Sequence, residues 1–351
     1  MRTETDVSEA QTIEITELCG DGIGPELEQS VAAVADALPI DLRFEKIDWS
    51  LERRERDGTV AIDEAEASMR RTRLGLKYPT VTGSVSPNAL LRRRLEFSVI
   101  YRPAISIPGI SSNFKQNVNA HIVRVATGGT YDDPGQLIGK HAAVSLRMVE
   151  REPCMHAAHY AFRLARSKGM TVTSSSKHTI QRVTDGLFED VVDEVHEQYK
   201  EEVADRKELF DALLAKLILR PQDYQVILVL NEYGDFLSDL ASGLVGSLGT
   251  GASGSFAFDA NHEVTLAMFD PAGGTAPDIA GQNKANPAAI MLALGMLLDH
   301  VDRFDVGHAL RLSLLGAIVD GETTGDLGGR LSTTDFTAEV VRRLPDHLPS
   351  T

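Results

Sequence analysis

Asp235 and Asp239 stand four residues apart in the stretch NEYGDFLSDLASGLVG, residues 231–246. In a helix this spacing puts both carboxylates on one face, one turn apart, where like charges repel. The pair indicates either a helix start, with Asp235 as the N-cap and Asp239 in the first turn, or oxygen ligands of a divalent cation. A third carboxylate, Asp211 in ELFDALLAKLILRP, lies at the edge of a predicted apolar helix face. Three aspartates suit Mg²⁺ or Mn²⁺.

A cluster of arginines at 92–94, in ALLRRRLEF, indicates a local anion site or a solvated helix face. The net charge of −16 argues against a nucleic-acid partner, which requires clustered basic residues. We expect no membrane span, since no run of about 18 apolar residues occurs. The two cysteines among 351 residues fit a reducing cytoplasm, which is the localisation that we predict.

The elements that must position these side chains alternate along the chain. The stretch TIEITELCGDGIGPELEQSVAAVADAL predicts a strand, a glycine-rich turn and a helix, with Pro25 in the first helical turn. Further strands are expected at 41–49, 120–126, 170–176, 224–230 and 264–269, and the stretch 74–85 is expected to be a strand that breaks into a loop. Further helices are expected at 61–73, 149–168, 181–200, 206–219, 286–301 and 334–344. This alternation predicts an α/β protein with helices on both faces of a sheet.

Two glycine-rich stretches refine this expectation. GDGIGPE at 20–26 lacks the G-x-G-x-x-G spacing, so we do not predict an ordinary Rossmann fold. The stretch 243–254 is predicted to be a crossing point between lobes, because small residues allow close approach of backbones.

Several long stretches together resemble the β-decarboxylating dehydrogenases, the family of isocitrate, homoisocitrate and 3-isopropylmalate dehydrogenases. They are GDGIGPE, NEYGDFLSDLASGLVGSLG, FDPAGGTAPDIAGQNKANPAAIMLALGMLL and TTGDLGGRLSTTDF at 323–336, in the family's order over nearly the whole chain. The resemblance implies an isocitrate/isopropylmalate dehydrogenase-like fold, with two lobes around a mixed sheet. It implies a large cofactor-binding domain of residues 1–97 and 246–351, and a small dimerisation and metal-binding domain of residues 98–245. The active site is expected in the cleft between the domains of an obligate homodimer.

The implied activity is a metal-dependent oxidation of a 2-hydroxy acid, followed by loss of CO₂. The resemblance assigns the substrate carboxylates to Arg92, Arg102 and Arg124, whose planar, permanently charged groups bind carboxylates bidentately. It makes Tyr131 the acid that protonates the carbon left by decarboxylation, although a tyrosine in TGGTY could simply be packed. It makes Lys177 the group that takes the hydroxyl proton.

The metal ligands implied by the resemblance are Asp211, Asp235 and Asp239. In the family the lysine and the first of these aspartates reach the active site of the partner subunit. We therefore expect Lys177 and Asp211 to act in the partner's site.

Asp278 in GGTAPDIAG specifies the cofactor. A carboxylate there can accept hydrogen bonds from both ribose hydroxyls of NAD and repels the 2′-phosphate of NADP. The alternative is that Asp278 caps a helix. The resemblance implies further cofactor contacts at Lys77, Thr80, Thr82, Asn231, Gly274, Thr275, Ala276, Ile279 and Asn286. Among these, Asn286 is expected to contact the adenine.

The sequence departs from the family pattern at a few positions. Gly273 replaces a histidine on the adenine side, so the affinity for NAD is expected to fall. Val125 replaces a common glutamate and Ala126 a common asparagine or leucine, so the wall near the substrate is expected to be less polar. The loop LKYPTVTGSVSPN is shorter than in most isocitrate dehydrogenases.

Ser86 and Asn88 in that loop resemble the isocitrate-type enzymes and indicate an anionic 3-substituent. A (2R)-malate of this kind could be isocitrate, homoisocitrate or a phosphonomethylmalate from a secondary pathway. The alternatives are an isopropylmalate- or tartrate-type dehydrogenase, and a noncatalytic regulatory subunit of the same family. Retention of Tyr131, Lys177 and the three aspartates argues against the regulatory role.

Overall fold

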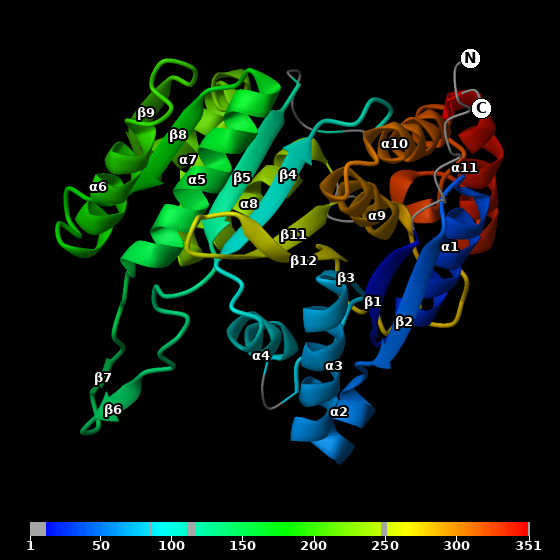
Figure 1. Cartoon of the computed structure of the whole chain (residues 1–351), viewed down its shortest axis with the longest axis horizontal. Helices are drawn as coiled ribbons and strands as arrows, with labels where there is room; N and C mark the ends of the chain where they lie inside the picture. Colours follow the sequence, from blue (N-terminus) through cyan, green and yellow to red (C-terminus); the bar gives the residue numbers. More distant parts are fainter. Residues whose placement is uncertain (1–11, 84–85, 111, 113–116, 247–250, 350–351) are drawn as a thin grey trace, which may run out of the picture. The chain divides into compact units, whose positions relative to one another are not determined.

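The computed structural model describes residues 12–83, 86–110, 112, 117–246 and 251–349, which form two compact units (Figure 1). The first unit comprises Met1–Pro87 and Met268–Thr351, and the second comprises Asn88–Ala267. The two units thus divide at 87/88 and 267/268, rather than at the predicted 97/98 and 245/246. The reason is that β4 (Val99–Ile105) pairs antiparallel with β11 (Ala252–Phe258), which brings residues 252–258 into the second unit.

The first unit has strands in the order β2-β1-β3-β12, and the chain passes from the second unit to the first within β12. Their bounds are Ile13–Cys19 for β1, Leu42–Asp48 for β2, Leu74–Lys77 for β3 and Val264–Pro271 for β12. Strand β1 pairs in parallel with both β2 and β3. The helices are α1 (Gly24–Ala37), α2 (Leu51–Asp57), α3 (Thr59–Thr72), α9 (Ala288–His300), α10 (Phe304–Val319) and α11 (Thr333–His347). Pro25 stands in the first turn of α1, as predicted.

The second unit has strands in the order β11-β4-β5-β10-β8-β9. The remaining bounds are Asn119–Val125 for β5, Val172–Ser176 for β8, Asp205–Leu209 for β9 and Val226–Val229 for β10. Strands β4 and β5 are antiparallel, whereas β5, β10, β8 and β9 are parallel, so the sheet is mixed. A two-stranded ribbon of β6 (Gln136–Ile138) and β7 (Ala142–Val144) accompanies it. The helices are α4 (Pro87–Arg94), α5 (Arg151–Lys168), α6 (Thr184–His196), α7 (Phe210–Leu219) and α8 (Asn231–Val245).

Alternation along β5 places its side chains on two faces of the sheet. Ala120 and Ile122 join a buried cluster with Leu213 of α7 and Leu237 of α8. Figure 1 shows α5 on one side of β5 and α8 on the other. Arg124 belongs to the face of Ile122, so it points toward α8, and Val125 points the opposite way.

Two expectations about helix starts are wrong. Helix α8 begins at Asn231, so Asp235 and Asp239 lie inside it, and Asp235 is not an N-cap. The helix predicted from 206 begins at Phe210, because residues 205–209 pair with β8 as the edge strand β9. Of the stretch 243–254, residues 247–250 are outside the described ranges, and residues 243–246 and 251–254 belong to the second unit.

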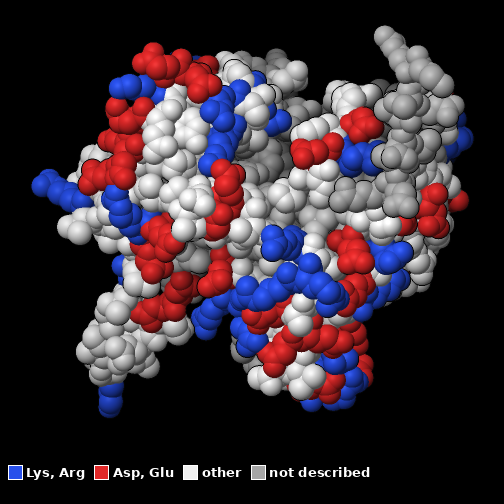
Figure 2. Space-filling view, in the orientation of Figure 1, with Lys and Arg blue, Asp and Glu red and all other residues white. Residues whose placement is uncertain are grey.

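Figure 2 shows acidic and basic side chains interspersed over the face in view. No helix within the described ranges has the length and apolar character that crossing a bilayer requires.

Candidate active site

Asp235 is the centre of a polar cluster in the second unit. One carboxylate oxygen accepts a hydrogen bond from Arg124 Nη1 and lies 3.6 Å from Arg102 Nη1. The other oxygen accepts a hydrogen bond from the Tyr131 hydroxyl at 3.1 Å. Burial alone would raise the pKa of Asp235, but the charges of Arg124 and Arg102 hold it below its ordinary value. The carboxylate is therefore ionised at neutral pH.

Arg124 is buried on β5 and held rigidly from α8. The side-chain oxygen of Asn231 accepts from its Nε at 3.0 Å and from its Nη2 at 2.7 Å, and the Asn231 amide donates to the Gly128 carbonyl at 2.9 Å. Burial and the repulsion of Arg92 lower the pKa of Arg124 to about 10, so the guanidinium stays charged. The side-chain amide of Asn231 is therefore bound to Arg124 and to the Gly128 carbonyl. The cofactor role expected for Asn231 stays a prediction.

Gly234 makes that close approach possible. A Cβ at this position would lie 2.6–2.9 Å from the Cβ, Cγ and Cδ atoms of Arg124. Alanine there would therefore displace the arginine or the helix. The Arg102 guanidinium is fixed from the same helix, since its Nη1 donates to Ser238 Oγ at 2.7 Å.

Tyr131 is half-exposed, with its ring 5.7 Å from the Arg124 guanidinium carbon. Burial and the Asp235 carboxylate raise the pKa of its hydroxyl. The phenol is therefore protonated at neutral pH and can donate a proton, which is the state that a general acid requires.

Lys177 and Asp211 form a second polar group in the same unit. Lys177 follows β8, and its Nζ lies 2.9 Å from Asp211 Oδ1 in the first turn of α7. The hydrogen bond from Lys177 lowers the pKa of the Asp211 carboxyl. The Asp211 side chain is 69% exposed, so this pair faces solvent and is accessible to another molecule.

The positions of the three aspartates decide whether one chain alone could hold a divalent cation. Among the described residues, the only three potential ligands whose donor atoms gather within 4.8 Å are Glu17, Cys19 and Glu28 in the first unit. That group already has a cation, because Lys46 pairs with Glu28. Asp211 is thus not brought to Asp235 and Asp239 within one chain. The carboxylate donors suit a hard cation such as Mg²⁺ or Mn²⁺, provided that a second chain supplies the third ligand.

Helix α4 contributes the remaining arginine. Arg92 Nη1 donates to the Ala126 carbonyl at 3.2 Å, beside Arg124 in sequence. Asn88 is exposed four residues earlier, so it shares a face of the helix with Arg92.

The expectation that Val125 makes the substrate wall less polar is wrong. Val125 is buried on the face of β5 opposite Arg124. Ala126 is also buried, and its contribution to the cluster is the backbone oxygen that accepts from Arg92.

Most of the expected cofactor residues of the first unit lie on loops, whereas Lys77 ends strand β3. The Ile23 amide donates to the Thr275 carbonyl at 3.0 Å, which joins the GDGIG turn to the GGTAPDI loop. A Cβ on Gly22 would lie 2.0 Å from the same carbonyl, so only glycine fits. Asp278 is exposed in a turn that spans 277–283. No helix begins there, so the helix-cap alternative for Asp278 is wrong.

Other predicted cofactor residues make hydrogen bonds or ion pairs within the first unit. Lys77 is buried, with its ammonium 3.1 Å from the Tyr78 carbonyl and 3.5 Å from Asp270. Asn286 accepts from the Ala288 amide at 2.9 Å, at the start of α9. The space around Gly273 and Gly274 is open for a Cβ. The other predicted positions on these loops, all on the surface or partly buried, are Thr80, Thr82, Ser86, Ala276 and Ile279.

Comparisons with known proteins agree with this architecture. A family model described as isocitrate/isopropylmalate dehydrogenase matches residues 14–340. The chain is 34% identical over 341 residues to a mitochondrial NAD isocitrate dehydrogenase regulatory subunit of Dictyostelium discoideum, covering 95% of this chain and 92% of that protein. It is 33% identical over 338 residues to the alpha subunit of the human mitochondrial NAD isocitrate dehydrogenase, covering 95% and 90%. The crystal structure of isocitrate dehydrogenase from Methylococcus capsulatus superposes with a TM-score of 0.86 at 31% identity, covering 94% of this chain and 99% of that chain.

The fold and the sequence similarity define an α/β dehydrogenase with a mixed sheet. The chain belongs to the isocitrate/isopropylmalate dehydrogenase family. The predicted family, fold class and enzyme class, a β-decarboxylating dehydrogenase, are therefore confirmed. The family uses NAD and Mg²⁺ or Mn²⁺, which confirms the predicted cofactors at the level of the family.

Sequence reasoning missed the residues that hold the expected site residues in place. Asn231, Gly234, Asp235 and Ser238 follow a spacing of three to four on α8 and therefore share a face. That period could have shown that this face of α8, and not Asp235 alone, contacts the arginines.

Proposed function

We propose that this chain is a catalytic enzyme that oxidatively decarboxylates a (2R)-malate with an anionic 3-substituent, using NAD and Mg²⁺ or Mn²⁺. The observation that carries the proposal is the convergence of Arg124, Arg102 and Tyr131 on Asp235. Two guanidinium groups at one point suit a substrate with several carboxylates. Asn88 and Arg92 on one face of α4 add a polar, cationic surface that suits an acidic 3-substituent.

The side chains of this chain have distinct tasks in the proposed reaction. Arg102 and Arg124 orient the substrate carboxylates, and their rigid attachment to α8 lowers the entropic cost of that orientation. Lys177 takes the hydroxyl proton, and the protonated Tyr131 gives a proton to the carbon that loses CO₂. A divalent cation held by Asp235, Asp239 and a partner's aspartate would supply Lewis-acid polarisation of the substrate oxygen.

We propose that two copies of the chain form a homodimer with shared sites, each giving Lys177 and Asp211 to its partner. The support is that Lys177 pairs with Asp211, while Asp235 pairs with the arginines and Tyr131. The human relative is named as one subunit of its enzyme, so a mixed assembly is the alternative. Both cysteines are free, which fits the cytoplasmic localisation that forms part of this proposal.

A regulatory role is the second candidate, because the Dictyostelium relative is named as a regulatory subunit at a similar level of identity. Gly273, which replaces a histidine on the expected adenine side, also favours it. A turnover screen with NAD and Mn²⁺ distinguishes the two candidates. It should include isocitrate, homoisocitrate, isopropylmalate, malate, tartrate and phosphonomethylmalate. The proposal expects turnover of an acid with an anionic 3-substituent. Binding of NAD without turnover of any acid would favour the regulatory role.

A further inference from the structure

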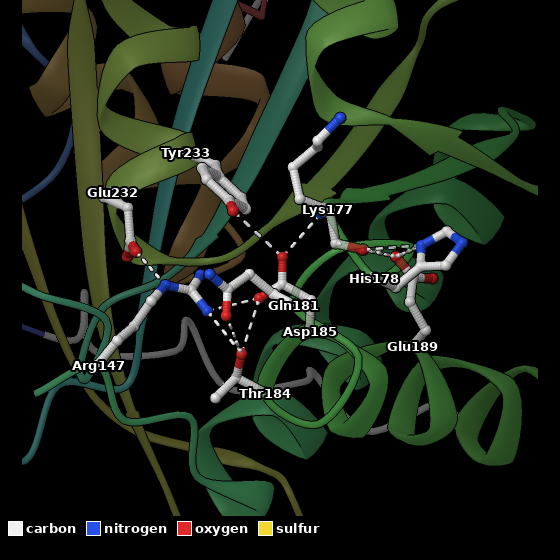
Figure 3. Close-up of polar contacts among 10 residues, drawn as sticks. Arg147, Lys177, His178, Gln181, Thr184, Asp185, Glu189, Glu232 and Tyr233 are labelled. Carbon is white, nitrogen blue, oxygen red and sulfur yellow. Dashed lines mark hydrogen bonds and ion pairs between the residues drawn. The ribbon is translucent and has the colours of Figure 1, made fainter.

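The backbone around Lys177 is fixed by two acidic residues of α6. Glu189 is buried, and its carboxylate accepts hydrogen bonds from Ser174 Oγ at 2.9 Å and Ser176 Oγ at 2.5 Å. His178 Nδ1 lies 3.8 Å from the same carboxylate (Figure 3). The residues on both sides of Lys177 are thus tied to one helix.

Asp185 is the second of these residues, one helical turn before Glu189, and it is fully buried. Its Oδ2 accepts from the backbone amide of Lys177 at 2.7 Å and from the Tyr233 hydroxyl at 3.2 Å. Its Oδ1 accepts from Arg147 Nη1 at 2.5 Å. A carboxylate without access to water needs such a set of donors, since an unpaired buried charge is strongly destabilising.

Arg147 connects this carboxylate to the rest of the candidate site. Its Nε donates to Glu232 Oε1 at 2.6 Å, and its guanidinium carbon lies 5.3 Å from the Tyr233 ring centre (Figure 3). Burial would lower the pKa of Arg147, but Glu232 and Asp185 raise it above its ordinary value. The guanidinium is charged between two carboxylates.

The segment after Arg147 is also tied to the loop that leads to Tyr131. Met148 and Gly129 exchange two backbone hydrogen bonds, of 2.7 and 3.1 Å. A Cβ on Gly129 would lie 1.9 Å from Glu232 Oε2. One network therefore joins the Lys177 turn, the Tyr131 loop and the start of α8.

We propose that Asp185 is a positioning residue for catalysis, which sets the place of Lys177 through its backbone amide and is itself held by Arg147. The inference rests on the proposed function, because only that function gives Lys177 a proton to move. Lys177 has a long and flexible side chain, so a fixed backbone decides where its ammonium can reach. A shift of about 1 Å in a catalytic group can cost about a hundredfold in rate.

The test compares Asp185→Asn with Asp190→Asn, a change of an exposed carboxylate on the same helix. The Lys177 amide and Arg147 donate to different oxygens of Asp185, and asparagine keeps an acceptor oxygen at only one of these two positions. In Asp185→Asn we expect hydrogen exchange of the Lys177 amide to be at least about tenfold faster. We expect kcat to fall about a hundredfold, while the KM values for acid and NAD stay within about threefold. Asp190→Asn should match the unsubstituted protein in each measurement.

A double-mutant cycle separates positioning from general damage. Because Asp185 acts through Lys177, Asp185→Asn should cause no further loss of kcat in a Lys177→Ala background. Unchanged amide exchange, or losses that add in the cycle, would overturn the inference. If the unsubstituted protein turns over no candidate acid, the proposed function fails, and amide exchange still decides whether Asp185 fixes the Lys177 backbone.

A second variant keeps the test decisive if Asp185→Asn does not fold. Arg147→Lys keeps the charge but cannot donate to Glu232 and Asp185 as a fork does. Faster exchange of the Lys177 amide and a lower kcat are expected. A Lys177 amide that exchanges at the original rate in this variant would overturn the inference.

Discussion

Asp235→Asn should tighten the binding of an anionic acid in the absence of metal, while it abolishes turnover in its presence. In the ligand-free chain Asp235 occupies Arg124 and Arg102, so a substrate carboxylate must displace it. The substitution removes this internal competitor. It also removes a carboxylate expected to hold the cation.

The magnitude follows from the distance and the exposure. At the 3.6 Å between Arg102 Nη1 and Asp235 Oδ1, Coulomb attraction is about 1 kcal/mol in water and about 5 kcal/mol at an effective dielectric constant of about 20. The Asp235 side chain is 36% exposed, so solvent screening keeps the effect near the lower end, at about 1–2 kcal/mol. We therefore expect the Kd of isocitrate in chelator to fall about tenfold.

Calorimetry in chelator and turnover in Mn²⁺ provide the assay. Asp239→Asn is the matched control, since it changes the carboxylate one turn later on the same helix. This control should weaken the dependence of turnover on metal, without tightening the binding of isocitrate in chelator. NAD binding should be nearly unchanged in both variants. Weaker binding of isocitrate to Asp235→Asn in chelator, or full turnover in Mn²⁺, would refute the reasoning.

Three further predictions follow from other parts of the chain. NAD should be preferred over NADP by about one to two orders of magnitude in kcat/KM, because Asp278 repels a 2′-phosphate by a few kcal/mol. Equal kcat/KM values for the two cofactors would count against this. Gly273→His should also lower the KM for NAD, whereas the control Gly274→His should not. Burial lowers the pKa of His159 and of His121 to about 4 from 6.5, so the unfolded chain binds more protons between these values. The free energy of unfolding should then decrease as pH falls from about 6.5 toward 4, by up to about 3 kcal/mol per histidine. Urea unfolding at pH 7.5 and pH 5 checks this, and His159→Gln should lose less stability over that interval than the unsubstituted chain; an equal loss would contradict it. Lys177→Ala and Arg92→Ala chains, each nearly inactive alone, should together recover roughly a quarter of the original activity, because about half of the dimers in a random mixture are mixed and each has one intact site. Absence of recovery after confirmed subunit exchange would mean that each chain builds its own site.

The parts of the fold that the sequence predicts are those with a local physical cause. The strand, turn and helix at the N-terminus follow from apolar alternation and from Pro25. Helix α10 packs against α9 and α11. Apolar residues stand on its buried face and also at less buried positions such as Leu312, Leu315 and Val319, so the sequence lacks a clear amphipathic period and does not predict the helix. Strand β9 was mistaken for helix, because pairing with β8 at the sheet edge decides its conformation.

In the candidate site, too, the sequence predicts local features but not the contacts between distant segments. The spacing of Asp235 and Asp239 indicates a shared helix face, and the structure has both on α8. The partner of Asp235 is Arg124, which is 111 positions distant in the chain, and no local pattern predicts that pairing. Asp185 and Arg147 were overlooked for a similar reason. Each looks like an ordinary surface charge in the sequence, and only the fold buries them together.

The central claim is that this chain couples oxidation to decarboxylation at a metal-dependent site. The most direct test measures NADH and CO₂ together while the purified chain acts on isocitrate, or on the best acid of the screen, with Mn²⁺. We expect equal amounts of the two products, and loss of both when a chelator removes the metal. NADH without CO₂, or full activity in thorough chelator, would contradict it.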